Sequence, residues 1–344
     1  MLKLNVNASR SYDITITKGF SGLSAAAEKF CGGKIALITD ENVDKLFSDD
    51  VLNELKGFEV VKFVIEAGEK SKNGENFLSL VNGLAEHGFQ RRDAVFALGG
   101  GVVGDLAGFT ASAYMRGITL VALPTSLLAA VDSSVGGKTA IDLPAGKNLC
   151  GSFYQPFAVY INADCFRTLP QKEKKNGLGE VVKYALLDRR VTLESMLEGF
   201  DEQLVYDCLS VKRDVVQADE FEGGKRMILN LGHTVGHAVE KLADYTLSHG
   251  ECVAKGLAAA IAVSKKLYGL SGSEVEKMRK VLTVCDFDLS LGFGADEISD
   301  CISRDKKSEG DEVNFVALKG IGEPRIEKIK IKELRKILSE YYGN

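Results

Sequence analysis

The chain has 344 residues, about twice the length of a typical domain, so two packed domains are expected. Its 43 lysines and arginines stand against 48 aspartates and glutamates, and this net charge of −5 gives no electrostatic basis for binding nucleic acid or an anionic membrane. Seven cysteines without a CxxC pair argue against a disulfide framework or a thiolate zinc site. Since no signal-peptide pattern and no run of about 18 apolar residues occurs, we expect a cytoplasmic protein with small-molecule partners.

The first half of the chain alternates short β-rich runs with helical patterns. The β-rich runs occupy 35–40, 60–65, 94–100, 118–124 and 157–162. Amphipathic stretches such as 74–87 lie between them, which is the rhythm of a mostly parallel sheet covered by helices. This order predicts an α/β, Rossmann-like nucleotide-binding domain.

After residue 170 the strand signal almost vanishes. Residues 171–304 show mainly helical periodicity, followed by a weak strand at 313–318 and a charged helix near 331–342. We therefore expect an α/β domain over 1–168 and an all-α, metal-binding domain over 169–344.

Three loops that follow predicted strands are candidates for holding a dinucleotide. The glycine-rich GGGVVGD at 99–105 separates a strand from a helix, a position where backbone N–H groups can bind a pyrophosphate. TDEN at 39–42 places Asp40 where it can bind a ribose, and GEKSK occupies 68–72 after the next strand. For the glycine-rich turn alone, a merely tight connection between strand and helix is an equally good interpretation.

The stretch from 124 to 142, continued by GKN at 146–148, is rich in hydroxyl groups, glycine and lysine. Little of it has the pattern of a core strand or a regular helix, so it predicts a long loop. Such loops are uncommon unless they bind a ligand, although a plain surface loop is the alternative.

Three of the four histidines, His233, His237 and His249, lie close together in the sequence. The first two are spaced i, i+4, which places both rings on one face of a helix. Glu180 lies in an apolar helical stretch, where an unpaired charge is costly. Imidazole and carboxylate suit Zn²⁺ or a similar ion, so a metal site is predicted. Lys183 is one turn from Glu180, and a helix salt bridge is the simple explanation for it.

Several longer motifs identify a family. They are GGGVVGD (99–105), YMRG (114–117), PTSLLAAVDSSVGGKT (124–139), GKN (146–148), FYQP (153–156), RTLP (167–170), GEVVKY (179–184), RMILNLGHTVGHAVE (226–240), SHGE (248–251) and RDKK (304–307). In these motifs the chain resembles the 3-dehydroquinate synthases over nearly its whole length. Ser126, Leu231 and Val235 depart from residues that are common in that family.

The resemblance implies a role for each matching residue. It implies one divalent metal, zinc or cobalt, on Glu180, His233 and His249, whereas His237, a further ligand by spacing alone, faces the substrate phosphate. It implies substrate contacts at Asp132, Lys138, Lys147, Asn148, Lys183, Lys212, Arg226, Asn230, His237 and Lys306 or Lys307, with Arg116 reaching across a homodimer interface. It implies NAD contacts at Asp40, Asn42, Glu69, Lys72, Gly100, Gly101, Asp105, Thr125, Ser126, Thr168 and Leu169, and cofactor contacts also at Asp132, Lys138 and Lys147. From the pattern alone, Lys212, Arg226, Lys306 and Lys307 would be solvated surface residues.

The activity implied by the resemblance is the conversion of 3-deoxy-D-arabino-heptulosonate 7-phosphate to 3-dehydroquinate and phosphate. It proceeds by NAD-dependent oxidation, phosphate elimination, reduction and intramolecular aldol closure, and it belongs to the shikimate pathway. A metal-dependent polyol dehydrogenase of the same architecture is the main alternative. The spacing of the motifs also leaves open a non-catalytic protein that binds NAD or metal.

Overall fold

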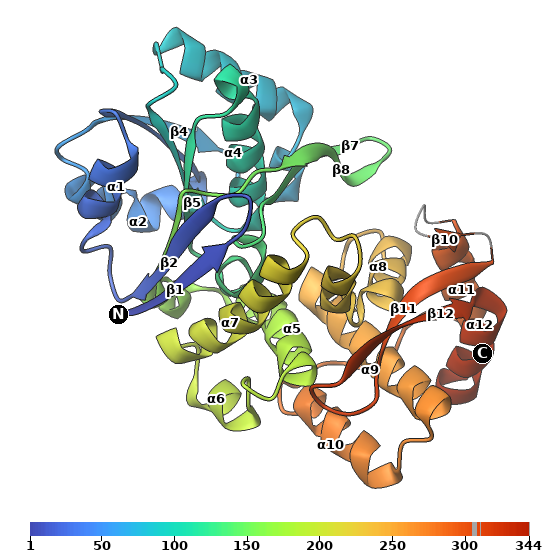
Figure 1. The fold of residues 1–344 in the computed structure, drawn as a ribbon. Coiled ribbons are helices and arrows are strands. Elements are labelled where there is room, and N and C mark those ends of the chain that lie inside the picture. The colour runs from blue at the N-terminus through green and yellow to red at the C-terminus, as the bar shows by residue number, and fades with distance from the viewer. Residues whose placement is uncertain (305–307, 310, 344) are drawn as a thin grey trace. The chain divides into compact units, whose positions relative to one another are not determined.

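The structure is a computed structural model that describes residues 1–304, 308–309 and 311–343 (Figure 1). The chain forms two compact units. The first comprises Met1–Leu169 and Phe200–Phe221, and the second comprises Pro170–Gly199 and the chain from Glu222 onward. The segment 200–221 therefore packs with the first unit, although its sequence position follows the predicted boundary. The division of the chain into folding domains over 1–168 and 169–344 remains a prediction.

The elements of the first unit are mostly strands and the helices that connect them. They are β1 (Leu2–Asn7), β2 (Ser11–Thr17), α1 (Leu23–Phe30), β3 (Lys34–Asp40), α2 (Glu41–Glu54), β4 (Glu59–Ile65), η1 (Glu69–Ser71), α3 (Gly74–Glu86), β5 (Ala94–Gly99), α4 (Gly101–Ala113), η2 (Tyr114–Arg116), β6 (Thr119–Pro124), η3 (Ala129–Ser133), β7 (Lys138–Leu143), β8 (Gly146–Phe153), β9 (Ala158–Asn162), η4 (Ala163–Thr168) and α7 (Glu202–Ala218).

The elements of the second unit are mostly helices. They are α5 (Gln171–Leu187), α6 (Leu193–Glu198), η5 (Lys225–Asn230), α8 (His233–Leu242), α9 (His249–Tyr268), α10 (Gly272–Thr283), α11 (Ala295–Ser303), β10 (Ser308–Glu309), β11 (Glu312–Leu318), β12 (Pro324–Lys330) and α12 (Ile331–Tyr342). Among the described residues, no helix is both long and apolar enough to cross a membrane.

A seven-stranded sheet in the order β1-β2-β9-β6-β5-β3-β4 organises the first unit. All its neighbouring strands pair in parallel except β1 and β2, which form an antiparallel hairpin at one edge. The five predicted strands are confirmed to within one residue at each end. The edge hairpin was not predicted, although its alternating burial over Leu2–Asn7 is a strand pattern.

The order of the strands fixes where loops can gather. From β3 the chain crosses to β4 on one side, and the next strand, β5, lies on the other side of β3. The loops after β3 and β5 therefore leave the sheet at a point where successive connections diverge. In open parallel sheets such a point, at the carboxyl ends of the strands, is where ligands bind.

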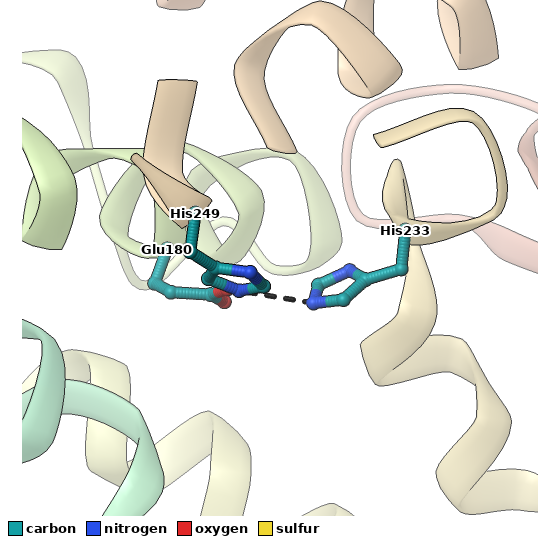
Figure 2. A group of neighbouring side chains, drawn as sticks. All are labelled: Glu180, His233 and His249. Atoms are coloured by element: carbon teal, nitrogen blue, oxygen red, sulfur yellow. Dashed lines mark hydrogen bonds and ion pairs between the residues drawn. The ribbon is translucent and has the colours of Figure 1, made fainter. Parts of the chain in front are cut away.

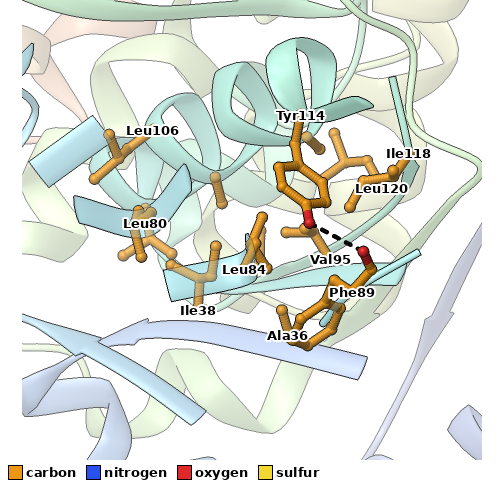
Figure 3. Close-up of a cluster of buried hydrophobic side chains, with 14 of the residues drawn as sticks. Ala36, Ile38, Leu80, Leu84, Phe89, Val95, Leu106, Tyr114, Ile118 and Leu120 are labelled. Atoms are coloured by element: carbon orange, nitrogen blue, oxygen red, sulfur yellow. Dashed lines mark hydrogen bonds between the residues drawn. The ribbon is translucent and has the colours of Figure 1, made fainter. Parts of the chain in front are cut away.

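Helices α3 and α4 cover one face of this sheet with a buried apolar layer (Figure 3). Leu84 on α3 and Leu106 on α4 meet Ala36, Ile38 and Val95 from the strands, and all five side chains are fully buried. Alternate strand residues point to the opposite face. The layer also holds one polar group in place, because the Tyr114 hydroxyl donates to the Phe89 carbonyl at 2.9 Å.

Helix α9 is the centre of the second unit. It is buried from Cys252 to Ser264 and packs against α5, α8, α10 and α12. The predicted helical character of this region is confirmed, and the unit also carries an antiparallel sheet, β10-β11-β12. Only its central strand was predicted from the sequence. The central position of α9 lets residues at its first turn meet side chains from α5 and α8.

The prediction of a long loop between 124 and 142 is wrong. A π-helical turn, η3, is followed by the antiparallel hairpin of β7 and β8. The burial of β7 alternates through Thr139 and Ile141, but its sequence KTAIDL does not alternate polar and apolar residues, and β8 carries exposed residues on both faces, so neither strand has a clear pattern in the sequence. The hairpin presents the GKN motif on a defined backbone rather than on an irregular loop.

Candidate active site

A close crossing of α5 and α9 positions two of the predicted metal ligands. A Cβ placed on Gly179 of α5 would come within 2.7 Å of the carbonyl carbon of Gly250 on α9. The side-chain oxygen of Asn176 also accepts the N–H of Gly250 at 2.8 Å. Glu180 and His249 are the sequence neighbours of these two glycines. The crossing therefore brings their side chains to one place.

The third predicted ligand, His233, is the first residue of α8. The residue before it, Gly232, has a left-handed backbone with φ of 81°, which favours glycine. Helix α8 also approaches α9 closely, since a Cβ on Gly236 would lie 2.8 Å from the carbonyl oxygen of Cys252. The turn and the close packing place the imidazole of His233 beside the other two side chains.

Figure 2 shows Glu180, His233 and His249 turned toward one another. Glu180 Oε1 lies 3.0 Å from His249 Nε2 and 3.5 Å from His233 Nε2. Each residue offers one ligand atom, and these atoms all lie within 4.8 Å of one another. Two imidazole nitrogens and a carboxylate oxygen are a donor set that suits Zn²⁺ or Co²⁺. The residues present therefore fit the predicted metal, and their assignment as ligands stays a prediction.

Lys183 lies one turn along α5 from Glu180 and pairs with its Oε2 atom. Both side chains are only 2% exposed. Burial alone would raise the pKa of Glu180, but Lys183 and the two histidines outweigh burial and hold it well below its ordinary value. The carboxylate is therefore ionised. The salt bridge that spacing suggested for Lys183 is present, and its contact with substrate stays a prediction.

The two histidines of the cluster differ in charge. Burial lowers the pKa of His233, which favours the neutral imidazole that binds metals. Its Nδ1 lies 3.1 Å from the carbonyl oxygen of Leu231, so a proton held there leaves Nε2 for a metal. Burial alone would lower the pKa of His249 too, but hydrogen bonds to Glu180 and Glu240 raise it to about 10. A metal must therefore displace a proton from His249.

His237 lies beside the cluster and is exposed on α8. Its ring centroid is 5.1 Å from that of His233 and 5.9 Å from that of His249. Among the residues that the structure describes, its ligand atom groups with those of Glu240 and His249 and not with Glu180. The position separates His237 from Glu180, and the phosphate role that the resemblance implies and the ligand role that spacing suggested both remain predictions.

The phosphate-binding residues predicted in the second unit lie on or beside η5. Arg226 is 2% exposed, so it is not the solvated surface residue that its pattern alone suggested. Asn230 donates its side-chain amide to Glu222 Oε1 at 2.8 Å. Glu222 was not selected from the sequence, because nothing in its local pattern distinguishes it from a surface acid. Lys306 and Lys307 lie outside the described residues.

Two residues predicted to contact substrate meet in the first unit. Lys212 on α7 places its Nζ atom 3.1 Å from Asp132 Oδ1 and 2.7 Å from the Asp132 carbonyl oxygen. Lys212 is 5% exposed, so it too is not a solvated surface residue. The pair ties α7 to η3, which explains in part why the segment 200–221 belongs to the first unit.

The remaining basic residues predicted at the site lie nearer the surface. Lys138 begins β7 and is exposed, and Lys147 on β8 is half-buried. Arg116 is exposed on η2, where φ is 65° for Arg116 and 49° for Met115. A left-handed backbone is uncommon for residues of these types. The contacts predicted for Lys138 and Lys147, and the dimer contact of Arg116, stay predictions.

Lys72 is the centre of a polar network in the first unit. Its Nζ atom lies 3.0 Å from Glu69 Oε1, 3.2 Å from Asp105 Oδ2 and 2.8 Å from Asn148 Oδ1. Asp142 Oδ1 is 3.8 Å from the same atom and accepts the N–H of Asn148 at 2.8 Å. The network joins three predicted NAD residues to Asn148, which was predicted to contact substrate. Asp142 was missed because it lies in the segment interpreted as a loop.

The network strongly affects Asp105. Burial raises the pKa of Asp105 to about 6, although the nearby Lys72 ammonium lowers it. The side chain is 20% exposed. This carboxyl group therefore titrates near pH 6, above the range of an ordinary aspartate.

The other predicted NAD residues follow the carboxyl ends of the parallel strands. Asp40 ends β3 and caps α2, with its Oδ1 accepting the N–H of Asn42 at 2.9 Å. Gly100 and Gly101 follow β5 at the N-terminus of α4, where backbone N–H groups can bind a pyrophosphate. Four more lie after β6 or at the end of η4, namely Thr125, Ser126, Thr168 and Leu169.

A pocket of the first unit opens among these strand ends. Its lining includes Gly100, Asp105, Ser133 and Lys138. A Cβ on Gly100 would lie 3.3 Å from Ser126 Oγ, so a larger residue there would crowd the turn. The pocket is lined by residues that were predicted to bind NAD, which supports this prediction.

Solved structures with a similar fold carry both kinds of ligand predicted here. 2-Deoxy-scyllo-inosose synthase, solved with carbaglucose-6-phosphate, NAD⁺ and Co²⁺, has a TM-score of 0.88 at 24% identity, with 98% of this chain and 99% of that chain covered. 2-Epi-5-epi-valiolone synthase from Streptomyces hygroscopicus subsp. jinggangensis, solved with NAD⁺ and Zn²⁺, has a TM-score of 0.84 at 22% identity, with 98% of each chain covered. The chain therefore has the fold of the dehydroquinate synthase-like proteins, with a Rossmann-like unit and a helical unit.

Sequence comparison narrows this class. The family model described as 3-dehydroquinate synthase N-terminal matches residues 62–176, and the one described as 3-dehydroquinate synthase C-terminal matches residues 177–308. The 3-dehydroquinate synthase of Clostridium acetobutylicum is 42% identical over 347 aligned positions, covering 95% of this chain and 96% of the relative. This chain belongs to the 3-dehydroquinate synthase family.

Proposed function

We propose that the protein is a 3-dehydroquinate synthase, a carbon–oxygen lyase that converts 3-deoxy-D-arabino-heptulosonate 7-phosphate to 3-dehydroquinate and phosphate. The observation that carries the proposal is the identity of 42% to a curated synthase over 95% of the chain. The grouping of Glu180, His233 and His249 within one unit supports it, because the reaction needs a Lewis acid beside the substrate hydroxyls.

Each unit supplies part of the machinery. When bound, NAD⁺ would accept a hydride from C5 and return it, and a divalent metal would polarise the substrate hydroxyls. In the first unit, Gly100 and Gly101 hold the pyrophosphate on backbone N–H groups, and Asp40 holds a ribose. In the second unit, Glu180 and the two histidines hold Zn²⁺ or Co²⁺.

Basic side chains assist the elimination of phosphate. Arg226, in the second unit, presents a planar guanidinium that can hold two phosphate oxygens at once. A lysine of the Lys306–Lys307 pair, together with His237, completes the proposed phosphate site. These charges stabilise the leaving group, whose departure breaks the bond between carbon and oxygen.

Two other functions are compatible with the sequence motifs alone. A polyol dehydrogenase has no anionic group to neutralise, so it gives no reason to bury the guanidinium of Arg226. A non-catalytic protein that binds NAD or metal is disfavoured by the 42% identity to a curated synthase over 95% of the chain. Both observations favour the synthase.

The decisive experiment measures phosphate release and NADH together, with NAD⁺ supplied at a concentration far below that of the substrate. A synthase returns its hydride to the same carbon, so phosphate should accumulate over many turnovers while absorbance near 340 nm stays flat. A polyol dehydrogenase would produce one NADH for each product and stop when its NAD⁺ was used. Bound NAD and metal without turnover would instead support the non-catalytic alternative.

The cellular setting is part of the same proposal. We place the enzyme in the cytoplasm as a homodimer in which Arg116 reaches the partner. Arg116 is exposed on a turn with a left-handed backbone, and this position supports the role because it leaves the long side chain at the surface. Measurement of molar mass in solution, for the wild type and for Arg116→Ala, tests the assembly.

A further inference from the structure

The imidazole of His249 has a carboxylate on each side. Its Nε2 lies 3.0 Å from Glu180 Oε1, within the proposed metal cluster. Its other nitrogen, Nδ1, lies 3.5 Å from Oε2 of Glu240 on α8. The two ring nitrogens point in different directions, so a metal bound at Nε2 lies away from Glu240. Glu240 therefore faces the ring nitrogen of His249 that does not face Glu180.

The position of Glu240 on α8 belongs to the pattern of the site. It follows His233 by seven residues and His237 by three, so the three side chains share one face of the helix. Glu240 is 9% exposed. A carboxylate is costly to bury at a position that packing alone could fill with an apolar residue. Its place beside His249 gives a physical reason for the acid.

His233 and His249 each have an oxygen atom beside the Nδ1 atom of the ring. For His233, the carbonyl oxygen of Leu231 lies 3.1 Å from Nδ1. For His249, the atom facing Nδ1 is a side-chain carboxylate oxygen, that of Glu240. Histidines that bind metals usually donate the second ring N–H to such an acceptor, which fixes the tautomer and the ring plane. The acceptor beside His249 is a side chain, so a substitution can remove it, whereas the acceptor beside His233 is a backbone carbonyl.

We propose that Glu240 is a positioning residue, which holds the Nδ1–H of His249 and so presents Nε2 to the divalent metal. The proposal rests on the metal site of the proposed function. Without Glu240, the ring of His249 can rotate or carry its proton on Nε2, and either change weakens the metal ligand. Glu240 acts on the reaction only through His249.

The experiment measures Co²⁺ binding to metal-free protein for the wild type, Glu240→Ala and Glu240→Gln. Affinity is obtained by competition with a chelator, and the visible absorption of bound Co²⁺ reports the geometry of its ligands. We expect Glu240→Ala to bind Co²⁺ roughly 10- to 100-fold more weakly, with an altered spectrum. Glu240→Gln should lose much less, because its amide oxygen can still accept the Nδ1–H.

Glu327→Ala is the matched control, since it removes a carboxylate of the same unit that accepts a hydrogen bond from Tyr268 at 2.8 Å. It should bind Co²⁺ like the wild type. Wild-type affinity and spectrum in Glu240→Ala would overturn the proposal, as would equal losses in the alanine and glutamine variants. If the alanine variant does not fold, Glu240→Asp, which is too short to reach Nδ1, replaces it in both comparisons. Failure of the wild type itself to bind Co²⁺ would instead reject the metal site.

Discussion

Gly179 and Gly250 lie against each other where α5 crosses α9, with no room for a side chain on the first of them. Their neighbours in the sequence, Glu180 and His249, face each other at 3.0 Å. The separation of these two side chains is therefore set by backbone packing rather than by the side chains themselves. Glycine at this crossing has a geometric reason, since any Cβ would push the helices apart.

Gly179→Ala should lower both the stability of the protein and its affinity for metal. A Cβ at this position would lie 2.7 Å from the carbonyl carbon of Gly250, and forcing a methyl group into packed structure costs about 1 to 3 kcal/mol. Thermal unfolding and Co²⁺ titration measure the two effects. Gly272→Ala on α10 is the control, because nothing lies within 4 Å of its Cβ. Equal Co²⁺ affinity in the two variants would show that the crossing does not set the site.

Glu180→Gln should remove the metal from the purified protein. A neutral amide is a much poorer ligand than a carboxylate, and the change also removes the charge that faces Lys183. Breaking a buried ion pair costs about 3 to 5 kcal/mol, so metal content must be measured on protein shown to be folded. Glu173→Gln on the same helix is the control. Full metal content and full activity in Glu180→Gln would reject the ligand assignment.

Arg226→Lys should reduce kcat/KM for the phosphorylated substrate about tenfold or more, although the charge is kept. Lysine lacks the planar fork that holds two phosphate oxygens, and it is a compact, strongly hydrated cation. Steady-state phosphate release measures the loss. The exposed Arg279, replaced in the same way, should leave turnover unchanged. If Arg226→Lys retains wild-type kinetics, Arg226 does not contact phosphate.

Asp105→Asn should stabilise the protein above pH 6 and have little effect below pH 4. Because burial raises the pKa of Asp105 to about 6, the folded state binds its proton more tightly than the unfolded state. The stabilisation from that proton is complete below the unfolded pKa, about 3.9, and is lost as the pH rises through the folded one. Asparagine mimics the protonated form, so the gain at pH 8 should be about 3 kcal/mol.

Denaturant unfolding across this pH range tests the prediction, with the exposed Asp49→Asn on α2 as the control. A gain that is the same at pH 4 and at pH 8 would contradict it. NAD binding should weaken in Asp105→Asn above pH 6, where the wild-type carboxyl group is ionised, if the network around Lys72 holds the cofactor.

Local patterns in the sequence were sufficient to predict the parallel sheet and the histidine cluster. The buried strands are continuous apolar runs, and the spacing of His233 and His237 directly gives one helix face. Glu240 has the same spacing signal, but its partner, His249, begins another helix, and no local pattern shows that α8 and α9 cross there. For the same reason Asp142 was missed, since its link to Lys72 depends on how β7 and β8 pair. Such contacts depend on tertiary packing, which a single sequence does not display.

The return of the chain to its first unit has a practical consequence. Because the segment 200–221 packs on β1, β2 and η3, a fragment that ends at residue 169 would lack the helix that covers part of its own sheet. It would also lack Lys212, the partner of Asp132. A fragment that begins at residue 170 would carry α7 without the strands against which it packs. The fragment that begins at residue 170 keeps the whole second unit and exposes the apolar face of α7, whereas the fragment that ends at residue 169 lacks part of its own core, so we expect the N-terminal fragment made alone to be the less stable of the two.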